Sequence, residues 1–219
     1  MKIIELKDIG RASHSNNGLV DDFNKIKEKF IRKYSIEKDI LIYLLDHELR
    51  YISSAIDGDI KGKSFLDLGC GSTSYDRIAG YDNFIGISDG KRSRSFEPWL
   101  PRALYEMGVH VIGIDIGSLE GEEFEHHSLD LLEENALSVI PDHSIDYVHS
   151  RLLYSSPQLA NMVSSRDYPD IARKVKDKAI PYWSAGDGER LAGAVLEQKL
   201  LPQIERVLKP TGSYLLFEI

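Results

Sequence analysis

The sequence contains little cysteine and no apolar run of membrane-spanning length. Cys70 is the one cysteine among 219 residues, so a disulfide within the chain is excluded and a reducing compartment is favoured. No signal peptide is visible, and no segment is typical of a transmembrane helix. These absences predict a cytoplasmic protein with no membrane partner. A chain of this length suffices for one domain that buries its own core.

Positive charge is also scarce. Lys and Arg number 27 against 35 Asp and Glu, which gives a net charge of −8. An excess of acid repels phosphate backbones, so the composition does not favour nucleic acid as a partner. Two basic clusters, 91–94 and 173–178, are exceptions, although such runs are usually solvated. The hydrophobic content of 42% and the charged content of 28% are typical of globular proteins.

The stretch 64–73 organises the rest of the chain, and it reads Ser-Phe-Leu-Asp-Leu-Gly-Cys-Gly-Ser-Thr. The apolar residues around Asp67 predict a buried strand, and Gly69 and Gly71 predict a sharp turn directly after it. Because glycine has no Cβ, the backbone of such a turn can approach a ligand closely. We expect the Asp67 carboxylate to face the same crevice.

Two kinds of nucleotide site compete for this turn. A dinucleotide fingerprint requires a third glycine, where this sequence has Ser74, and a helix that begins directly after the turn. No Walker pattern, Gly-x-x-x-x-Gly-Lys-Ser/Thr, occurs. By itself the turn is also compatible with a purely structural role, so its meaning depends on the segments that follow.

Buried runs that alternate with helical stripes predict an α/β fold around this strand. Further strands are expected over 109–115, 124–130, 145–150 and 213–219, and helices over 19–34, 36–56, 99–107, 131–139 and 189–208. Asp115 ends the expected strand over 109–115, the next one along the chain after 64–68. At that place a carboxylate with two acceptor oxygens can hold both hydroxyls of a ribose. Pro202 is expected to kink the last helix.

Several segments in order resemble the class I (Rossmann-like) S-adenosylmethionine-dependent methyltransferases. They are Asp67-x-Gly69-x-Gly71, Leu129-Asp130-Leu131, the run Pro141-Asp-x-Ser-x-Asp-x-Val-x-Ser150, and Arg206-Val-Leu-Lys-Pro-x-Gly212, where Thr211 replaces a usual glycine. The resemblance covers about 64–219. It implies an α/β fold with a doubly wound, mostly parallel sheet and helices on both faces, and S-adenosyl-L-methionine as the cofactor.

The resemblance also implies site residues. The cofactor-binding positions would be Asp67, Gly69, Gly71, Ser72, Asp115, Ile116, Asp130, Leu131 and Ser150. His149 and Tyr154 are the catalytic candidates. The resemblance implies that the carboxyl end of the strand over 145–150 faces the transferred methyl group, and histidine can act as a base near neutral pH. His149 could equally be a satisfied core histidine. We expect Asp67, Asp115 and Asp130 to converge on one nucleoside-sized hollow.

No metal site is predicted. His126 and His127 are adjacent on a predicted strand, so they point to opposite faces and cannot easily bind one ion together.

The domain organisation departs from the family at both ends of the sheet. Residues 1–60 are expected to form an N-terminal arm and helices that pack on or cap the core, and 61–219 the methyltransferase-like domain, with insertions near 74–98 and 161–188. The family fold usually continues past the fifth strand with a helix and two strands, one antiparallel, whereas this sequence stops at Ile219. An uncovered edge strand promotes association. The N-terminal segment, another subunit (in a homo-oligomer or with a partner) or nothing could cover this edge.

Three functional hypotheses follow. The first is an S-adenosylmethionine-dependent methyltransferase that acts on a small molecule or a biosynthetic intermediate by in-line methyl transfer. The second is a cofactor-binding or non-catalytic methyltransferase-like subunit that needs a partner, which the short sheet motivates. The third is an RNA or protein methyltransferase, which the clusters at 91–94 and 173–178 motivate. The sequence does not identify the methyl acceptor.

Overall fold

The structure is a computed structural model. It describes residues 1–5, 18–36, 39–56, 59–73, 87–88, 91–92, 94–151, 153–154, 159 and 187–217. Most of the expected insertions at 74–98 and 161–188, including the basic cluster 173–178, lies outside these residues.

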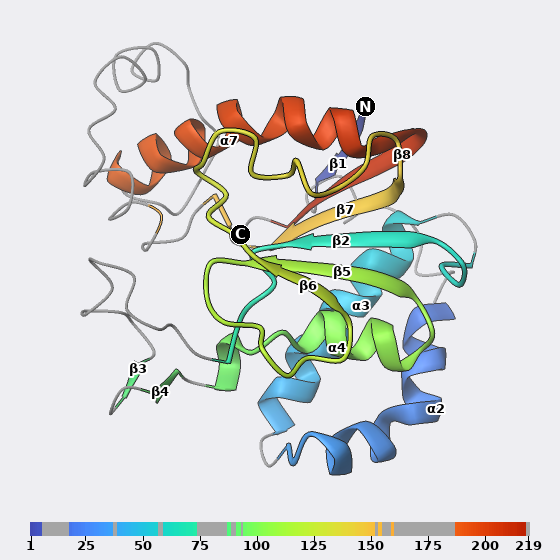
Figure 1. Cartoon of the computed structure of the whole chain (residues 1–219). Coiled ribbons are helices and arrows are strands. Elements are labelled where there is room, and N and C mark those ends of the chain that lie inside the picture. Colours follow the sequence, from blue (N-terminus) through green and yellow to red (C-terminus); the bar gives the residue numbers. More distant parts are fainter. Residues whose placement is uncertain are drawn as a thin grey trace.

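One six-stranded sheet forms the centre of the molecule, and all of its strand pairs are parallel (Figure 1). Its strands are β1 (Lys2–Glu5), β2 (Ser64–Leu68), β5 (His110–Asp115), β6 (Glu125–Ser128), β7 (Ile145–Arg151) and β8 (Leu208–Phe217), in the spatial order β1-β8-β7-β2-β5-β6. A separate antiparallel pair consists of β3 (Ile87–Ser88) and β4 (Lys91–Arg92).

The strand order reverses beside β2. After β2, the chain adds β5 and β6 on one side of it, and then returns to add β7 and β8 on the other side. In open parallel sheets, ligands bind outside the carboxyl ends of the strands at such a reversal. The carboxyl ends of β2, β5 and β7 therefore define the edge on which a site is expected.

Helices cover both faces of the sheet (Figure 1). One face packs against α3 (Asp39–Ala55) and α4 (Trp99–Glu106), which the short 3-10 helix η1 (Arg94–Phe96) precedes, and α2 (Gly18–Lys33) packs on these two helices. The other face packs against α7 (Asp187–Val207). Side chains alternate along a strand, so Phe65 enters the core under α3 and Leu66 the core under α7. The predicted α/β architecture with helices on both faces is confirmed. None of the described helices has the length and apolarity needed to cross a bilayer.

The sheet edge beyond β8 is filled by the N-terminal segment. β1 pairs with β8 from Lys2 opposite Ser213 to Glu5 opposite Leu216. The buried Tyr51 hydroxyl of α3 donates towards the carbonyls of Ile4 and Leu216, at 3.1 and 3.0 Å. Among the three alternatives for this edge, the first therefore holds. The outer side of β1 has no strand partner within the described part of the chain.

The helix predicted over 131–139 is wrong, because this segment consists of turns. Asn135 has a φ of 60°, which a right-handed helix does not allow. Side chains of α7 bind the backbone groups that a helix would have paired. Lys199 Nζ donates to the Leu132 carbonyl at 2.7 Å, and Gln203 Oε1 accepts from the Leu137 amide at 2.8 Å.

The beginning of β8 also differs from the predicted strand over 213–219. Leu208 already pairs with Ile145, but the next pair joins Ser213 to Tyr147, so 209–212 bulge opposite one residue of β7. That residue is Asp146, whose Oδ2 accepts from Lys209 Nζ at 2.6 Å. The bulge lies at the amino end of β7, away from the expected site. Pro202 lies inside α7.

Candidate functional site

The glycine turn after β2 has the backbone conformation that the sequence predicts. Gly69 and Gly71 have φ values of 69° and 95°, which favour glycine. Five consecutive amides of the turn donate to the protein: Gly69 and Cys70 to the Ile114 carbonyl, Gly71 to Asp115 Oδ2, Ser72 to the Phe96 carbonyl and Thr73 to the Ser118 carbonyl. A pyrophosphate needs such amides for itself. The turn is therefore not arranged as a phosphate cradle.

Asp115 lies at the end of β5 and faces this turn. Its Oδ2 accepts from the Gly71 amide at 2.9 Å and its Oδ1 from the Gly117 amide at 2.8 Å, and the residue is 5% exposed. Both carboxylate oxygens are hydrogen-bond acceptors, and both bind backbone amides, one in the turn and one after β5. Ile116, another predicted cofactor residue, is half-buried between Asp115 and Gly117.

The close approach that Gly71 permits is to the protein's own backbone. A Cβ on Gly71 would lie 2.3 Å from the Phe96 carbonyl oxygen and 3.0 Å from the Glu97 carbonyl carbon. At Gly69, by contrast, a Cβ would lie 2.9 Å from Leu153 Cδ1, the end of a flexible side chain. Ser72 is fully buried beside Gly71. Gly69 is half-buried, and only a side-chain end, not backbone, occupies the space beside it.

Asp67 faces a histidine on the neighbouring strand. It is opposite His149 of β7 in the sheet register, so both side chains lie on the same face. The distance from Asp67 Oδ1 to His149 Nδ1 is 2.7 Å, and the imidazole lies against the Phe65 ring with centroids 5.8 Å apart. The sequence predicted that Asp67 faces the cofactor crevice, whereas the structure places its carboxylate in this buried pair with His149 under α3.

Two further charged residues, the buried Glu48 and the half-buried Arg151, join Asp67 and His149 to form what we call the tetrad. Glu48 of α3 lies with Oε1 3.6 Å from His149 Nε2, and its Oε2 accepts from Arg151 Nη1 at 2.8 Å. The Arg151 guanidinium lies over the Phe217 ring, 5.3 Å from its centroid. His149 Nε2 and Arg151 Nε have no hydrogen-bond partner within the described part of the chain. The tetrad thus joins α3, β2 and β7.

The tetrad shifts two pKa values upwards. Burial lowers the pKa of His149, but the charge and hydrogen bond of Asp67, followed by the charge of Glu48, outweigh burial and raise it. Burial raises the pKa of the Glu48 carboxyl, and the opposing charges of Arg151 and His149 reduce this effect without reversing it. A raised pKa favours the protonated imidazole, which cannot accept a proton from a substrate.

Ser150 and Tyr154 lie on the opposite face of the sheet, under α7. Ser150 Oγ is 2.7 Å from the Tyr214 hydroxyl, which donates to the Tyr154 hydroxyl at 2.9 Å. Tyr154 is 1% exposed and His149 is 0% exposed. Consecutive strand residues point to opposite faces, which separates the neighbours His149 and Ser150. The two predicted catalytic residues are therefore buried on different faces and are not brought together.

Asp130 and Leu131 follow β6 close to the end of β5. Asp130 Oδ1 accepts from the Leu132 amide at 2.9 Å, and the Leu129 amide donates to the Asp115 carbonyl at 2.9 Å. Leu131 is buried. The segment 129–131 thus adjoins Asp115, as expected. The described contacts do not unite all three acids in one hollow, because Asp67 belongs to the tetrad.

Glu48 is the member of the tetrad that sequence reasoning missed. It interrupts the apolar stripe that Leu45, Leu49 and Ile52 form on α3, and this interruption was the signal that could have found it. In the part of the chain that the structure describes, no cluster of His, Cys, Asp or Glu could hold a metal ion.

These features define an α/β protein with an all-parallel six-stranded sheet, consistent with a Rossmann-like fold, and a glycine turn at the point where its strand order reverses. No protein-family model matches the sequence, and a search of curated proteins finds no match. The functional argument therefore depends on the geometry of the turn and of the residues around it.

Proposed function

We propose that the protein is an S-adenosylmethionine-dependent methyltransferase acting on a small molecule or a biosynthetic intermediate. The observation that carries the proposal is the glycine turn at the strand reversal, with its amides bound within the protein and Asp115 beside it. A site of this kind suits a ligand that brings ribose hydroxyls but no phosphate to the turn. S-adenosylmethionine is such a ligand, whereas a dinucleotide is not.

The residues around the turn fit a nucleoside. Asp115 would accept the ribose hydroxyls, because a carboxylate has two acceptor oxygens and this one lies beside the turn. The half-buried Ile116, next to the core that holds Leu131, would offer apolar surface for the base, and Asp130 an acceptor for its amino group. The atom nearest to the place of a Cβ on Gly69 is the end of the flexible Leu153 side chain, which a ligand would have to displace. Bound S-adenosylmethionine supplies an activated methyl group, and the chain's task is to orient the acceptor for in-line transfer.

In this proposal His149 and Tyr154 do not touch the methyl acceptor and act only through the residues that they contact. Neither ring reaches the surface, so neither is placed to take a proton from an acceptor. His149 holds Asp67 and Glu48 together beneath the carboxyl edge of the sheet.

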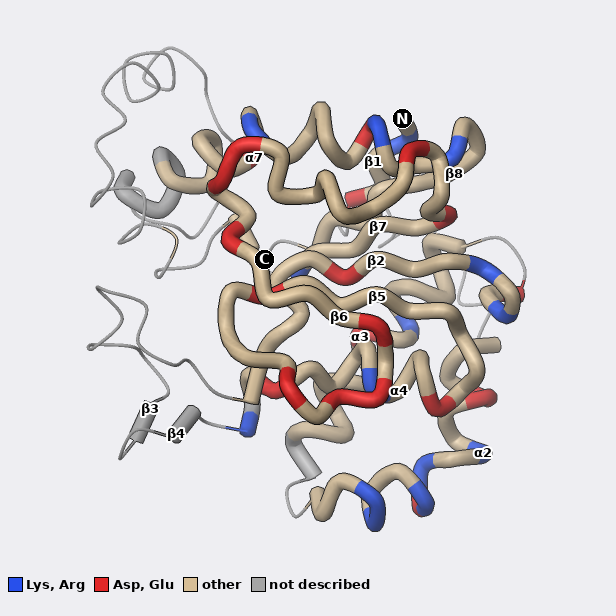
Figure 2. The backbone as a smooth tube through the Cα atoms, viewed as in Figure 1, with Lys and Arg blue, Asp and Glu red and all other residues tan. Residues whose placement is uncertain are grey.

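A second candidate is a cofactor-binding subunit that needs a partner for catalysis. The burial of both catalytic candidates favours it, as does the outer edge of β1, which lacks a strand partner among the described residues. A nucleic-acid substrate has less support. α2 carries Lys and Arg along its length (Figure 2), and one of them, Lys33, pairs with both Glu106 of α4 and Glu123 of the loop before β6.

Isothermal titration of the full chain with S-adenosylmethionine tests the proposal. We expect binding by the wild type and a loss of about tenfold or more in affinity for Asp115→Asn, because a charge-assisted hydrogen bond contributes that much to an equilibrium constant. Asp146→Asn is the matched control. Asp146 is a buried acid that also accepts a hydrogen bond from a backbone amide, that of Ser64 at 3.0 Å. It lies at the amino ends of the strands, away from the glycine turn.

Absence of binding by the wild type would reject the proposal. Equal losses in Asp115→Asn and Asp146→Asn would reject the assigned role of Asp115. If the wild type binds the cofactor, formation of S-adenosylhomocysteine with pools of small metabolites, but not with RNA, would separate the first function from the alternatives.

A further inference from the structure

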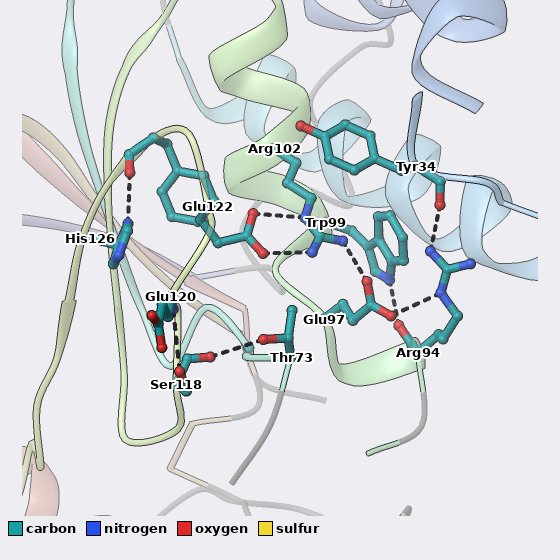
Figure 3. Close-up of polar contacts among 12 residues, drawn as sticks. Tyr34, Thr73, Arg94, Glu97, Trp99, Arg102, Ser118, Glu120, Glu122 and His126 are labelled. Carbon is teal, nitrogen blue, oxygen red and sulfur yellow. Dashed lines mark hydrogen bonds and ion pairs between the residues drawn. The ribbon is translucent and has the colours of Figure 1, made fainter. Parts of the chain in front are cut away.

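An alternating chain of charged side chains lies beside the glycine turn. Arg94 Nε donates to Glu97 Oε1 at 2.9 Å, and Glu97 Oε2 accepts from Arg102 Nη1 at 2.6 Å (Figure 3). Arg102 then binds Glu122 with two parallel bonds, from Nε at 2.9 Å and from Nη2 at 2.6 Å. Two arginines and two glutamates balance in charge, so the chain can be buried without a net charge. We call it the Arg-Glu chain.

Arg102 is the centre of this chain. It is 6% exposed, and its guanidinium contacts two aromatic rings that also contact each other, at 4.9 Å from the Tyr34 centroid and 4.7 Å from the Trp99 centroid. Three donated bonds and two ring contacts therefore restrict the position of the guanidinium. Lysine could supply the charge there but not the fork or the stacking.

One end of the chain holds the segment that covers the turn. Arg94 donates to the carbonyls of Tyr34 and Ser35 at the end of α2, at 2.6 and 2.7 Å, which fixes η1 to that helix. Glu97 directly follows Phe96, whose carbonyl accepts from the Ser72 amide at 3.0 Å and occupies the space that a Cβ of Gly71 would take. The position of Glu97 therefore determines where Gly71 can lie.

The other end of the chain holds the opposite side of the turn. Glu122 belongs to the loop after β5, and its amide donates to the Leu119 carbonyl at 3.1 Å. In the same loop, the Ser118 carbonyl accepts from the Thr73 amide at 3.2 Å and lies 3.3 Å from the Thr73 hydroxyl. The turn is thus held between two segments, 96–97 and 118–122, and Arg102 connects both.

We propose that the Arg-Glu chain positions the glycine turn and Asp115 for ligand binding, with Arg102 as the positioning residue. The Gly71 amide must point at Asp115 Oδ2, and this direction is fixed by the Phe96 carbonyl on one side and the Ser118 carbonyl on the other. Arg102 touches neither the turn nor the proposed ligand site directly. The inference rests on the proposed function for the identity of the ligand, but not for the order of the turn.

Arg102→Lys tests the inference in the full chain. We expect S-adenosylmethionine to bind about tenfold more weakly by titration calorimetry, which corresponds to one charge-assisted hydrogen bond. We also expect the amides of Gly71, Ser72 and Thr73 to exchange hydrogen about tenfold faster by NMR, because opening of the turn governs their exchange. The milder variant Arg94→Gln, at an exposed position, should shift both quantities in the same direction by less.

Arg206→Lys is the matched control. Like Arg102, Arg206 donates three hydrogen bonds, to the carbonyls of Ile140 at 3.0 Å and Leu137 at 2.6 Å and to the Asp142 carboxylate, but these lie before the amino end of β7. The variant Arg206→Lys should lower the thermal midpoint of unfolding without changing the affinity for S-adenosylmethionine or the amide exchange of residues 71–73. If Arg102→Lys changes exchange and affinity no more than Arg206→Lys does, the inference is overturned and the Arg-Glu chain is structural only.

The two readouts separate failure of the inference from failure of the proposed function. A wild type that does not bind S-adenosylmethionine contradicts the proposed function, while amide exchange still decides whether Arg102 orders the turn. Should Arg102→Lys not fold, Arg94→Gln with the same two measurements decides the inference, and unchanged exchange at 71–73 overturns it.

Discussion

The two faces of β7 bury polar groups of different kinds. Under α3, His149 belongs to a tetrad of ionisable groups, whereas under α7 the next residue, Ser150, belongs to a chain of neutral hydroxyls with Tyr214 and Tyr154. Buried charges require opposite charges close by, which explains why three elements contribute to the tetrad. Hydroxyls both donate and accept, so they satisfy one another. Charge and pH should therefore affect one face only.

The largest effect is expected from removing the acid that binds His149 directly at one end of the tetrad. Asp67→Ala leaves His149 without its hydrogen-bond partner and without the charge that holds its proton. Breaking a buried pair in this way should lower the free energy of unfolding by about 3 kcal/mol in urea denaturation. Asp67→Asn keeps the acceptor and the shape, so it should lose less. A variant Asp67→Ala as stable as the wild type would contradict the tetrad.

A smaller effect is expected on the hydroxyl face. Tyr214→Phe removes the group that lies between Ser150 and Tyr154, and urea denaturation should show a loss of about 1 kcal/mol, as for one neutral hydrogen bond. Tyr105→Phe, at a position that is 39% exposed, is the control and should change stability by less than about 0.5 kcal/mol. A loss as large as that of Asp67→Ala would remove the distinction between the faces.

The smallest expected effect is a change of the free energy of unfolding with pH. The folded pKa values of His149 and Glu48 both lie above their ordinary values of 6.5 and 4.5. The folded state therefore binds more protons than the unfolded state, and stability falls as pH rises. The contribution of His149 is complete below about pH 6.5 and is lost as pH rises through its folded pKa.

Urea denaturation at a series of pH values measures this slope. His149→Gln should flatten it above about pH 6.5, because it removes the group that titrates there. Tyr214→Phe should keep the wild-type slope, since its face holds no member of the tetrad. A slope that persists in His149→Gln would assign the pH dependence to other groups.

Local patterns in the sequence were sufficient to predict most elements of the fold. The strand at 64–68 followed by two glycines, and the run that ends at Asp115, occur where they were expected, because apolar residues and turn residues act over a few positions. The segment 131–139 was mispredicted because its backbone partners, Lys199 and Gln203, lie far away in the sequence. Tertiary contacts there outweigh helical spacing.

The candidate site was predicted less completely than the fold. The sequence indicated Asp115 beside the turn, but it did not reveal that Asp67 pairs with His149, a contact between residues 82 positions apart. The alternation of side chains along a strand is by itself enough to place His149 and Ser150 on opposite faces. The partner of Glu48 and the role of Arg102 depend on how α3 and α4 pack, which no local pattern encodes.

The pairing of β1 with β8 has a consequence for how the chain acquires its structure. Residues 2–5 are synthesised long before their partners at 213–216, which follow more than two hundred positions later. Contacts so remote in sequence form slowly, because a long loop must close before they stabilise anything. β1 therefore cannot pair until every other strand of the sheet has been synthesised, and water must satisfy its backbone groups until then.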